Sequence, residues 1–132
     1  MATLFTRIIQ GELPSYKVLE TDMVYCFLAL DQVTKGHTLI VPRIEVDHVL
    51  DVPDPHYSEV FKVAKQIGAS IQEAFGYARV SYMVQGFEVP HFHLHVLGLN
   101  QPSDLDFALG QQLPQVEMQD IQSQILKNLK SN

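Results

Sequence analysis

The stretch His91-Phe92-His93-Leu94-His95-Val96-Leu97-Gly98 decides how this chain is organised. Histidine alternates with apolar residues along it, which is the pattern of a half-buried β-strand. Because successive side chains of a strand point to opposite faces, the three histidines and Leu97 would share one face. The other face would carry Phe92, Leu94 and Val96. Histidine occurs six times in the whole chain, so three on one strand face indicate a site.

Composition predicts one globular domain of 132 residues with an ordinary core, since 46% of the residues are apolar and 18% are charged. The formal net charge of −6 argues against binding nucleic acid through a basic surface. A small anionic ligand stays possible, because it needs only local donors. The single cysteine, Cys26, excludes a disulfide framework and a cysteine-rich zinc site. Cys26 lies in an apolar run, which predicts a core residue.

Targeting features are missing from the sequence. The segment from Met1 to Arg7 lacks the apolar core of a signal peptide. No apolar run approaches the roughly 20 residues of a membrane span. We therefore expect a cytoplasmic protein without a membrane or nucleic-acid partner.

The first half of the chain predicts a short helix and three strands. Apolar residues at positions 4, 5, 8 and 9 suit an amphipathic helix that ends at Gly11, before Pro14. Strands are expected over 16–20 and 23–30, paired as a hairpin. A loop over 31–36 would lead to a third strand over 37–41, which Pro42 ends.

The second half predicts two more strands and two helices. After a connector over 44–53, Asp54-Pro55 is typical of a helix start, and Gly76 of a helix end. The helix between them keeps an apolar face with 3-to-4 spacing: Val60, Ala64, Ile67, Ile71 and Ala74.

A strand over 77–85 and the histidine strand follow, then a polar loop from 101 to about 114. Met118, Ile121, Ile125 and Leu129 predict a C-terminal helix. The fold class is α+β, with an antiparallel five-stranded sheet, one long central helix and a C-terminal helix.

The residues alone leave three interpretations of the histidine row. It could be the polar face of a sheet. It could hold Zn²⁺ or Fe²⁺ through two imidazoles at positions i and i+2, with Glu88 as the nearest carboxylate. It could act on a phosphate, because neutral imidazole is a good nucleophile near pH 7 and a second imidazole can donate hydrogen bonds to phosphate oxygens.

Three motifs in order resemble the histidine triad (HIT) superfamily. His91-x-His93-x-His95 with its apolar neighbours resembles the family signature, and Gly36 to Arg43 resembles a second element with a fourth histidine, His37. Residues 4–14 resemble the start of the Hint branch, and residues 86–91 are similar to a bacterial variant. The resemblance covers residues 3–98 of a single domain over 1–132, and residues 99–132 form a tail with a helix.

The resemblance implies a mechanism. His93 would attack the α-phosphorus of a bound nucleotide, with its other ring nitrogen held by a backbone carbonyl. The covalent nucleotidyl-histidine would then be hydrolysed to the nucleoside monophosphate. His95 would donate a hydrogen bond to the phosphate, and His91 and His37 would orient the nucleophile through a hydrogen-bonded relay. No metal or other cofactor is required.

The resemblance also implies a nucleoside pocket. Asp31 would accept from the ribose hydroxyls, and Gln85 would lie beside the phosphate. The base would lie between four apolar residues: Leu4, Phe5, Ile8 and Leu30. Plain core packing is the alternative for these four, and a turn is the alternative for Asp31.

The sequence departs from the family at three places, one of which is the tail beyond Gly98, where the leaving group is expected and the Hint ending is not matched. Phe87 and Glu88 stand where many relatives carry glutamine and a serine or threonine, so a hydroxyl near the phosphate is missing. Thr3 and Thr6 occupy the places of two cysteines that hold structural zinc in some relatives, so we expect that zinc site to be absent. His48 and His56 are then expected at the surface.

Taken together, these features predict a Hint-like homodimeric hydrolase or nucleotidyl transferase acting on purine nucleotides such as AMP or GMP. A nucleoside phosphoramidase is the first choice. The alternatives are a dinucleoside polyphosphate hydrolase, a nucleotide-binding regulatory protein with little turnover, and a metal-binding protein.

Overall fold

Five strands form one antiparallel sheet in the order β1-β2-β4-β6-β5. The computed structural model describes residues 2–129. The strands are β1 (Lys17–Glu20), β2 (Val24–Leu28), β4 (Thr38–Pro42), β5 (Arg79–Val84) and β6 (Leu94–Leu99). The helices are α1 (Leu4–Ile9), α2 (His56–Phe75) and α3 (Gln115–Asn128). The predicted α+β class, the five-stranded sheet, the long central helix and the C-terminal helix are all confirmed.

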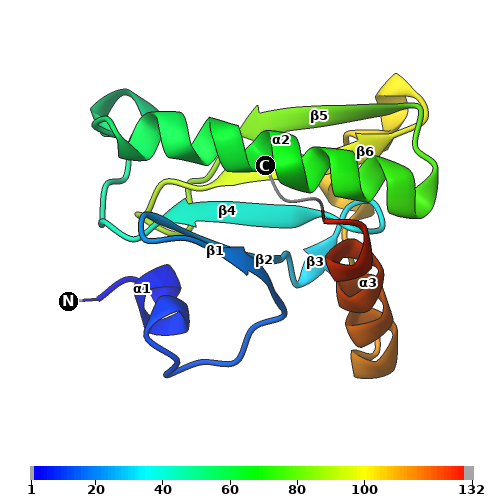
Figure 1. Ribbon diagram of the computed structural model, residues 1–132, viewed down its shortest axis with the longest axis horizontal. Helices are drawn as coiled ribbons and strands as arrows, with labels where there is room; N and C mark the ends of the chain where they lie inside the picture. The colour runs from blue at the N-terminus through cyan, green and yellow to red at the C-terminus, as the bar shows by residue number, and fades with distance from the viewer. Residues whose placement is uncertain (1, 130–132) are drawn as a thin grey trace.

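The helix α2 covers one face of the sheet (Figure 1). The apolar residues with 3-to-4 spacing pack against the strands and are fully buried: Val60, Ala64, Ile67 and Ile71. The helix ends at Gly76, whose φ of 69° is a left-handed conformation that glycine adopts without steric cost. α3 packs beside α2 and contributes three buried side chains to the same core: Met118, Ile121 and Ile125.

The opposite face of the sheet packs against α1. A second apolar cluster there joins Phe5 of α1 to Tyr25, Phe27, Leu39 and Val41. These strand residues alternate with the residues that face α2, as the period of two requires. Because His95 lies opposite Leu39 in the register of β4 and β6, the histidines belong to the α1 face.

The histidine stretch is a strand only in its second half. β6 begins at Leu94, whereas the alternation predicted a strand from His91, so that boundary is wrong. The backbone of Phe92 donates to Val46 of the 44–53 connector instead of to a strand. Opposite this segment β4 ends at Pro42, which has no N–H to donate. The side-chain alternation persists, because Phe92, Leu94 and Val96 all join the core under α2.

Segments predicted as loops contain short elements. β3 (Asp31–Gln32) pairs with β7 (Gln111–Gln112), and two 3₁₀ turns, η2 (Pro102–Asp104) and η3 (Phe107–Leu109), lie between β6 and β7. A third, η1 (Val49–Asp51), lies in the connector. Two-residue strands show no period, so hydrophobic patterning could not reveal them.

Three smaller predictions concern single residues. Cys26 is fully buried, as expected, and burial raises the pKa of its thiol. His48 is exposed as predicted, while His56 is half-buried at the start of α2. The N-cap of α2 is Pro55 and not the predicted Asp54, whose carboxylate lies one residue earlier and accepts from the backbone N–H of Ser58 at 3.0 Å.

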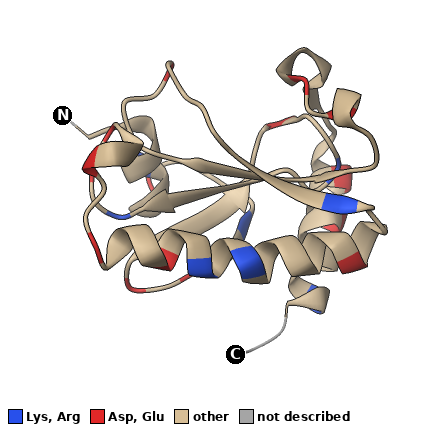
Figure 2. Cartoon of the chain, turned by 90° about the horizontal axis from the view of Figure 1, so that it is seen from above, with Lys and Arg blue, Asp and Glu red and all other residues tan. Residues whose placement is uncertain are grey.

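Charged side chains lie mostly on α2 and on the connecting segments, and the sheet carries few of them (Figure 2). Within residues 2–129, no helix is both long enough and apolar enough to span a membrane.

Candidate active site

His93 is held by a backbone carbonyl. Its Nδ1 lies 2.8 Å from the carbonyl oxygen of His91. A carbonyl can only accept, so Nδ1 carries the proton, and the neutral ring keeps an unprotonated Nε2. The ring of His91 is fixed in the same manner, with Nε2 donating to the carbonyl of Pro42 at 2.7 Å. Nδ1 of His91 then accepts from the hydroxyl of Thr3, also at 2.7 Å.

His37 and His95 form a second hydrogen-bonded chain. The backbone N–H of Val33 donates to Nδ1 of His37 at 3.3 Å, so Nε2 of His37 carries the proton. That N–H donates to Nδ1 of His95 at 2.9 Å. Nε2 of His95 in turn donates to the carbonyl of Gln85 at 2.8 Å. Each proton position follows from the previous one, so the chain fixes both tautomers.

All four histidines are buried and neutral at pH 7. Burial lowers the pKa of His37 to about 3, with the neighbouring His95 adding to the effect. Burial likewise lowers the pKa of His95 to about 4. It also lowers the pKa of His91 and of His93, against the opposing effect of their carbonyl hydrogen bonds. Neutral imidazole is the nucleophilic form, and these four rings have that form at pH 7 without first losing a proton.

The hydrogen bonds among the four histidines differ from the relay that the resemblance predicted. The ring of His91 does not bond to His93; the carbonyl of His91 does. His37 bonds to His95 and not to His93. The resemblance did predict that a backbone carbonyl would hold the second ring nitrogen of His93, and the carbonyl of His91 lies in that position.

The first turn of α1 is joined to this site. Thr3 caps the helix by accepting from the N–H of Thr6 at 3.1 Å while its hydroxyl donates to His91. Glu45 accepts from the N–H of Thr3 and the hydroxyl of Thr6 at 2.8 and 2.6 Å. Phe5, the second residue of α1, packs its ring edge-on to His93 with centroids 4.9 Å apart. The helix therefore supports the histidine directly.

A cavity of about 450 Å³ opens beside His93. It is called the first cavity here. Nine of the ten predicted site residues line it: Leu4, Phe5, Ile8, Leu30, Asp31, His37, Gln85, His93 and His95. The tenth, His91, lies behind His93, against Pro42 and Thr3.

The predicted base-binding residues differ in exposure. Phe5 is 5% exposed and packs edge-on to Phe27, so it is part of the core as well as of the cavity wall. Leu4 and Leu30 are 47% and 65% exposed, which leaves their side chains free to contact a ligand. Asp31 is exposed on β3, and its backbone pairs with Gln112.

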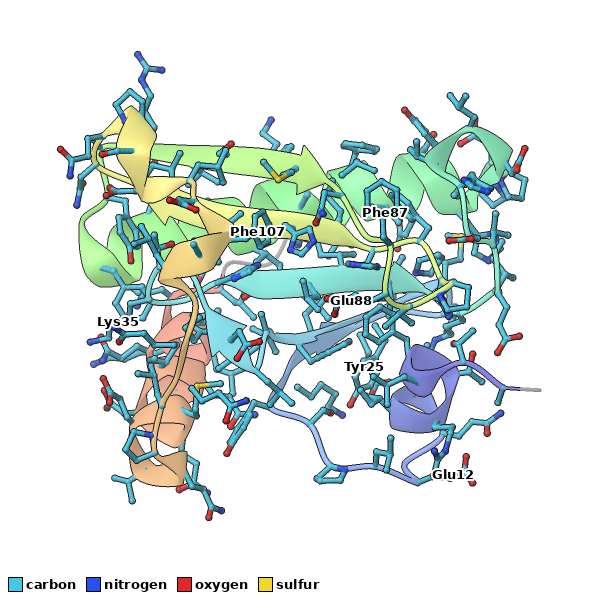
Figure 3. The ribbon with its side chains drawn as sticks, turned by 180° about the vertical axis from the view of Figure 1, so that it is seen from behind. Glu12, Tyr25, Lys35, Phe87, Glu88 and Phe107 are labelled. Atoms are coloured by element: carbon cyan, nitrogen blue, oxygen red, sulfur yellow. The ribbon has the colours of Figure 1, made fainter. Side chains whose placement is uncertain are left out.

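The loop over 85–90 covers His93. A methyl group at the α-carbon of Gly86 would lie 2.6 Å from Nε2 of His93, so only glycine fits there. Gln85 contributes its backbone carbonyl to His95 rather than the predicted amide. Figure 3 shows Phe87 and Glu88 on this loop, and Phe107 on a separate segment that belongs to η3. In this form the loop backbone occupies the space beside both Nε2 atoms.

Sequence reasoning missed three contributors to the site. Phe107 packs edge-on to His95, with centroids 5.0 Å apart, but it belongs to the polar tail and no motif marks it. Gly86 was predicted only as part of the motif over 86–91, without its close approach to His93. Thr3 was predicted only as the replacement of a cysteine, and its hydroxyl at the start of the predicted helix was the one signal for a hydrogen bond.

Within the described residues, no three His, Cys, Asp or Glu side chains are grouped so that they could hold a metal ion. The ring nitrogens of His37, His91 and His95 are all engaged in hydrogen bonds.

The comparisons with known proteins agree with this geometry. The family profile described as HIT domain matches residues 10–102. The protein named "Protein hit" of Bacillus subtilis is 30% identical over 98% of this chain and 95% of its own length. The purine nucleoside phosphoramidase of Escherichia coli is 33% identical over 73% of this chain and 86% of its own.

Among solved structures, a Hit-like protein from Bartonella henselae superposes with a TM-score of 0.83 at 22% identity, covering 96% of both chains. At that identity the superposition supports the fold alone. The profile match and the Bacillus subtilis relative show that this chain is a member of the HIT family.

Proposed function

We propose that this protein hydrolyses purine nucleoside phosphoramidates through a covalent nucleotidyl-His93 intermediate. The observation that carries the proposal is the unprotonated Nε2 of His93. The His91 carbonyl accepts from Nδ1 of the same ring at 2.8 Å, and the ring lines a cavity of about 450 Å³. Two family members at about 30% identity are named phosphoramidases, one from Escherichia coli and one from Saccharomyces cerevisiae.

The first half-reaction forms the bond from Nε2 of His93 to the α-phosphorus. The electron pair of the P–N bond passes to the leaving nitrogen, which takes up a proton from solvent water. In the second half-reaction a water oxygen attacks the phosphorus and returns a proton to solvent, the bond to Nε2 breaks, and His93 is regenerated. One water molecule is consumed for each nucleoside monophosphate and amine released.

His95 supplies the hydrogen bond to the phosphate. Its Nε2–H now donates to the Gln85 carbonyl, so a phosphate oxygen would replace that carbonyl once the loop over 85–90 moves away. His37 keeps this proton in place, because its own N–H occupies the other nitrogen of His95. A donor that is already oriented stabilises charge on the phosphoryl oxygens without reorganisation.

The nucleoside would occupy the first cavity. Leu4 and Leu30 offer exposed apolar surface for a purine, and Asp31 offers a carboxylate to the ribose hydroxyls. We also propose a homodimer formed through the sheet edge β5, where Tyr82 and Val84 are 43% and 45% exposed.

The test uses adenosine 5′-phosphoramidate and rapid acid quenching. Mass spectrometry of the quenched protein should show an adduct of one AMP residue, mapped to the peptide that contains His93. The matched control is His56→Gln, a histidine at the start of α2 that lies outside the first cavity, which should form the same adduct. Tight AMP binding with neither an adduct nor turnover would instead favour a regulatory nucleotide-binding protein.

A further inference from the structure

A second cavity of about 550 Å³ lies on the other side of the loop over 85–90. Residues 47–51 of the connector form its opposite wall. Four residues line both cavities: Gln85, Gly86, Phe87 and His93. The loop is therefore a partition, and His93 is the side chain at which the two spaces meet.

His93 directs a free nitrogen into this region. The residue is 9% exposed, its Nδ1 is engaged by the His91 carbonyl, and no hydrogen bond within residues 2–129 involves its Nε2. This nitrogen is therefore free to meet a ligand that enters the region. A phosphorus atom bonded to this nitrogen would lie where Gly86 now lies, at the boundary between the cavities.

The two cavities have the same sign of charge. Asp47 and Asp51 line the second, and Asp31 and Glu88 line the first. No lysine or arginine of the described chain lines either cavity. A leaving group with further phosphates would bring negative charge against these carboxylates with no cation to compensate it.

The second cavity also has apolar surface to offer. Leu50 is 93% exposed and Phe87 is 94% exposed, and both line it. Large apolar side chains in contact with water gain free energy when a ligand covers them. The lining thus combines carboxylates with two uncovered apolar groups.

We propose that the second cavity is the leaving-group subsite, and that it accepts cationic or neutral amines with an apolar body while it disfavours anionic leaving groups. The inference rests on the proposed function, since it assigns the non-nucleoside half of the substrate. It also distinguishes the two enzymatic alternatives, because a dinucleoside polyphosphate would place several negative charges in this space.

The test uses three adenosine 5′-phosphoramidates with leaving amines of similar length. The amines are 1,4-diaminobutane, its mono-acetyl form, and 4-aminobutanoate, which carry a remote positive charge, none, and a negative charge. We expect kcat/KM to fall in that order, with about a tenfold difference between the cationic and anionic compounds, as two partly solvated carboxylates would give.

Two variants connect this preference to the cavity. Asp47→Asn combined with Asp51→Asn should bring the ratio of cationic to anionic kcat/KM to about one, and Asp51→Lys should invert it. Glu117→Gln, at an exposed position of α3 outside both cavities, is the charge-matched control and should keep the wild-type ratio.

The outcomes separate the two proposals. If the wild type hydrolyses all three compounds equally and the aspartate variants change no ratio, the subsite is wrong while the hydrolase stands. If the wild type hydrolyses none of them, the proposed function fails, and calorimetric binding of the same compounds decides the subsite. The same order of affinity would support it, and equal affinities would overturn it.

Discussion

The site has two halves that use the same side chain differently. In one half His91 and His93 are fixed by backbone carbonyls, and His93 is left with a free Nε2. In the other, His37 and His95 bond to each other, and every ring nitrogen is engaged. The difference teaches that the hydrogen-bond partners, and not the histidine signature, separate a nucleophile from a fixed donor.

The largest expected effect is the loss of the free nitrogen. His93→Ala removes the nucleophile, and kcat/KM for adenosine 5′-phosphoramidate should fall by about 10⁴-fold or more. Steady-state assay of AMP release measures it, and unchanged AMP affinity shows that the variant remains folded. Activity within tenfold of the wild type would mean that Nε2 of His93 is not the attacking atom.

The next largest effect on activity is expected at His95, in the half of the site that His37 and His95 form. His95→Ala removes the fixed donor but leaves the nucleophile, so we expect kcat to fall by about 10²- to 10³-fold. His95→Gln keeps an N–H that can reach the phosphate and should recover part of the loss. An equal loss for both variants would argue that His95 acts through packing alone.

A pH effect on stability also separates the halves. The pKa of His37 is about 3 and that of His95 about 4, below the 6.5 of an exposed histidine. As the pH falls, the unfolded chain therefore takes up protons before the folded protein does. The stability that the two neutral rings give the folded state is complete above pH 6.5 and declines below it. Between pH 6.5 and pH 5, each ring should lower the free energy of unfolding by about 2 kcal/mol.

Urea unfolding at pH 7, 6 and 5 measures this decline. His37→Gln removes one titrating ring from the pair and should flatten the dependence of the unfolding free energy on pH. The exposed His48 supplies the matched control, His48→Gln. A wild-type unfolding free energy that stays constant from pH 7 to pH 5 would contradict the neutral pair.

The sequence predicted the elements that repeat a pattern over many residues. α2 was predictable because five apolar positions keep one face over its whole length, between Asp54 and Gly76. The α1 helix and the β1–β2 hairpin followed from similar local patterns. The residues of the first cavity came from the resemblance, since nothing local links Leu4 to Asp31.

The parts that escaped prediction depend on contacts between distant segments. Phe107 reaches His95 because β3 and β7 pair, and two-residue strands leave no periodic trace. The resemblance predicted a backbone carbonyl on His93 but not that it belongs to His91, and nothing predicted the Gln85 carbonyl on His95, because a backbone atom carries no sequence information. Sequence patterns therefore indicated which side chains gather, but not which backbone groups hold them.

The smallest effect tests the support behind the nucleophile. Thr3→Val removes the hydroxyl that donates to Nδ1 of His91 and caps α1, which should lower the unfolding free energy by about 1 kcal/mol. Thr3→Ser keeps both hydrogen bonds and should match the wild type. Thr3→Asp keeps the cap but cannot donate, and its carboxylate would favour the charged ring and raise the pKa of His91.

NMR titration of the His91 ring distinguishes the two roles of Thr3. A raised pKa in Thr3→Asp, together with wild-type behaviour in Thr3→Ser, would show that the hydroxyl sets the tautomer of His91. Because the carbonyl of that same residue fixes His93, a change at Thr3 should alter kcat a few-fold and leave KM unchanged. If only the helix cap matters, Thr3→Asp would behave as the wild type in both measurements.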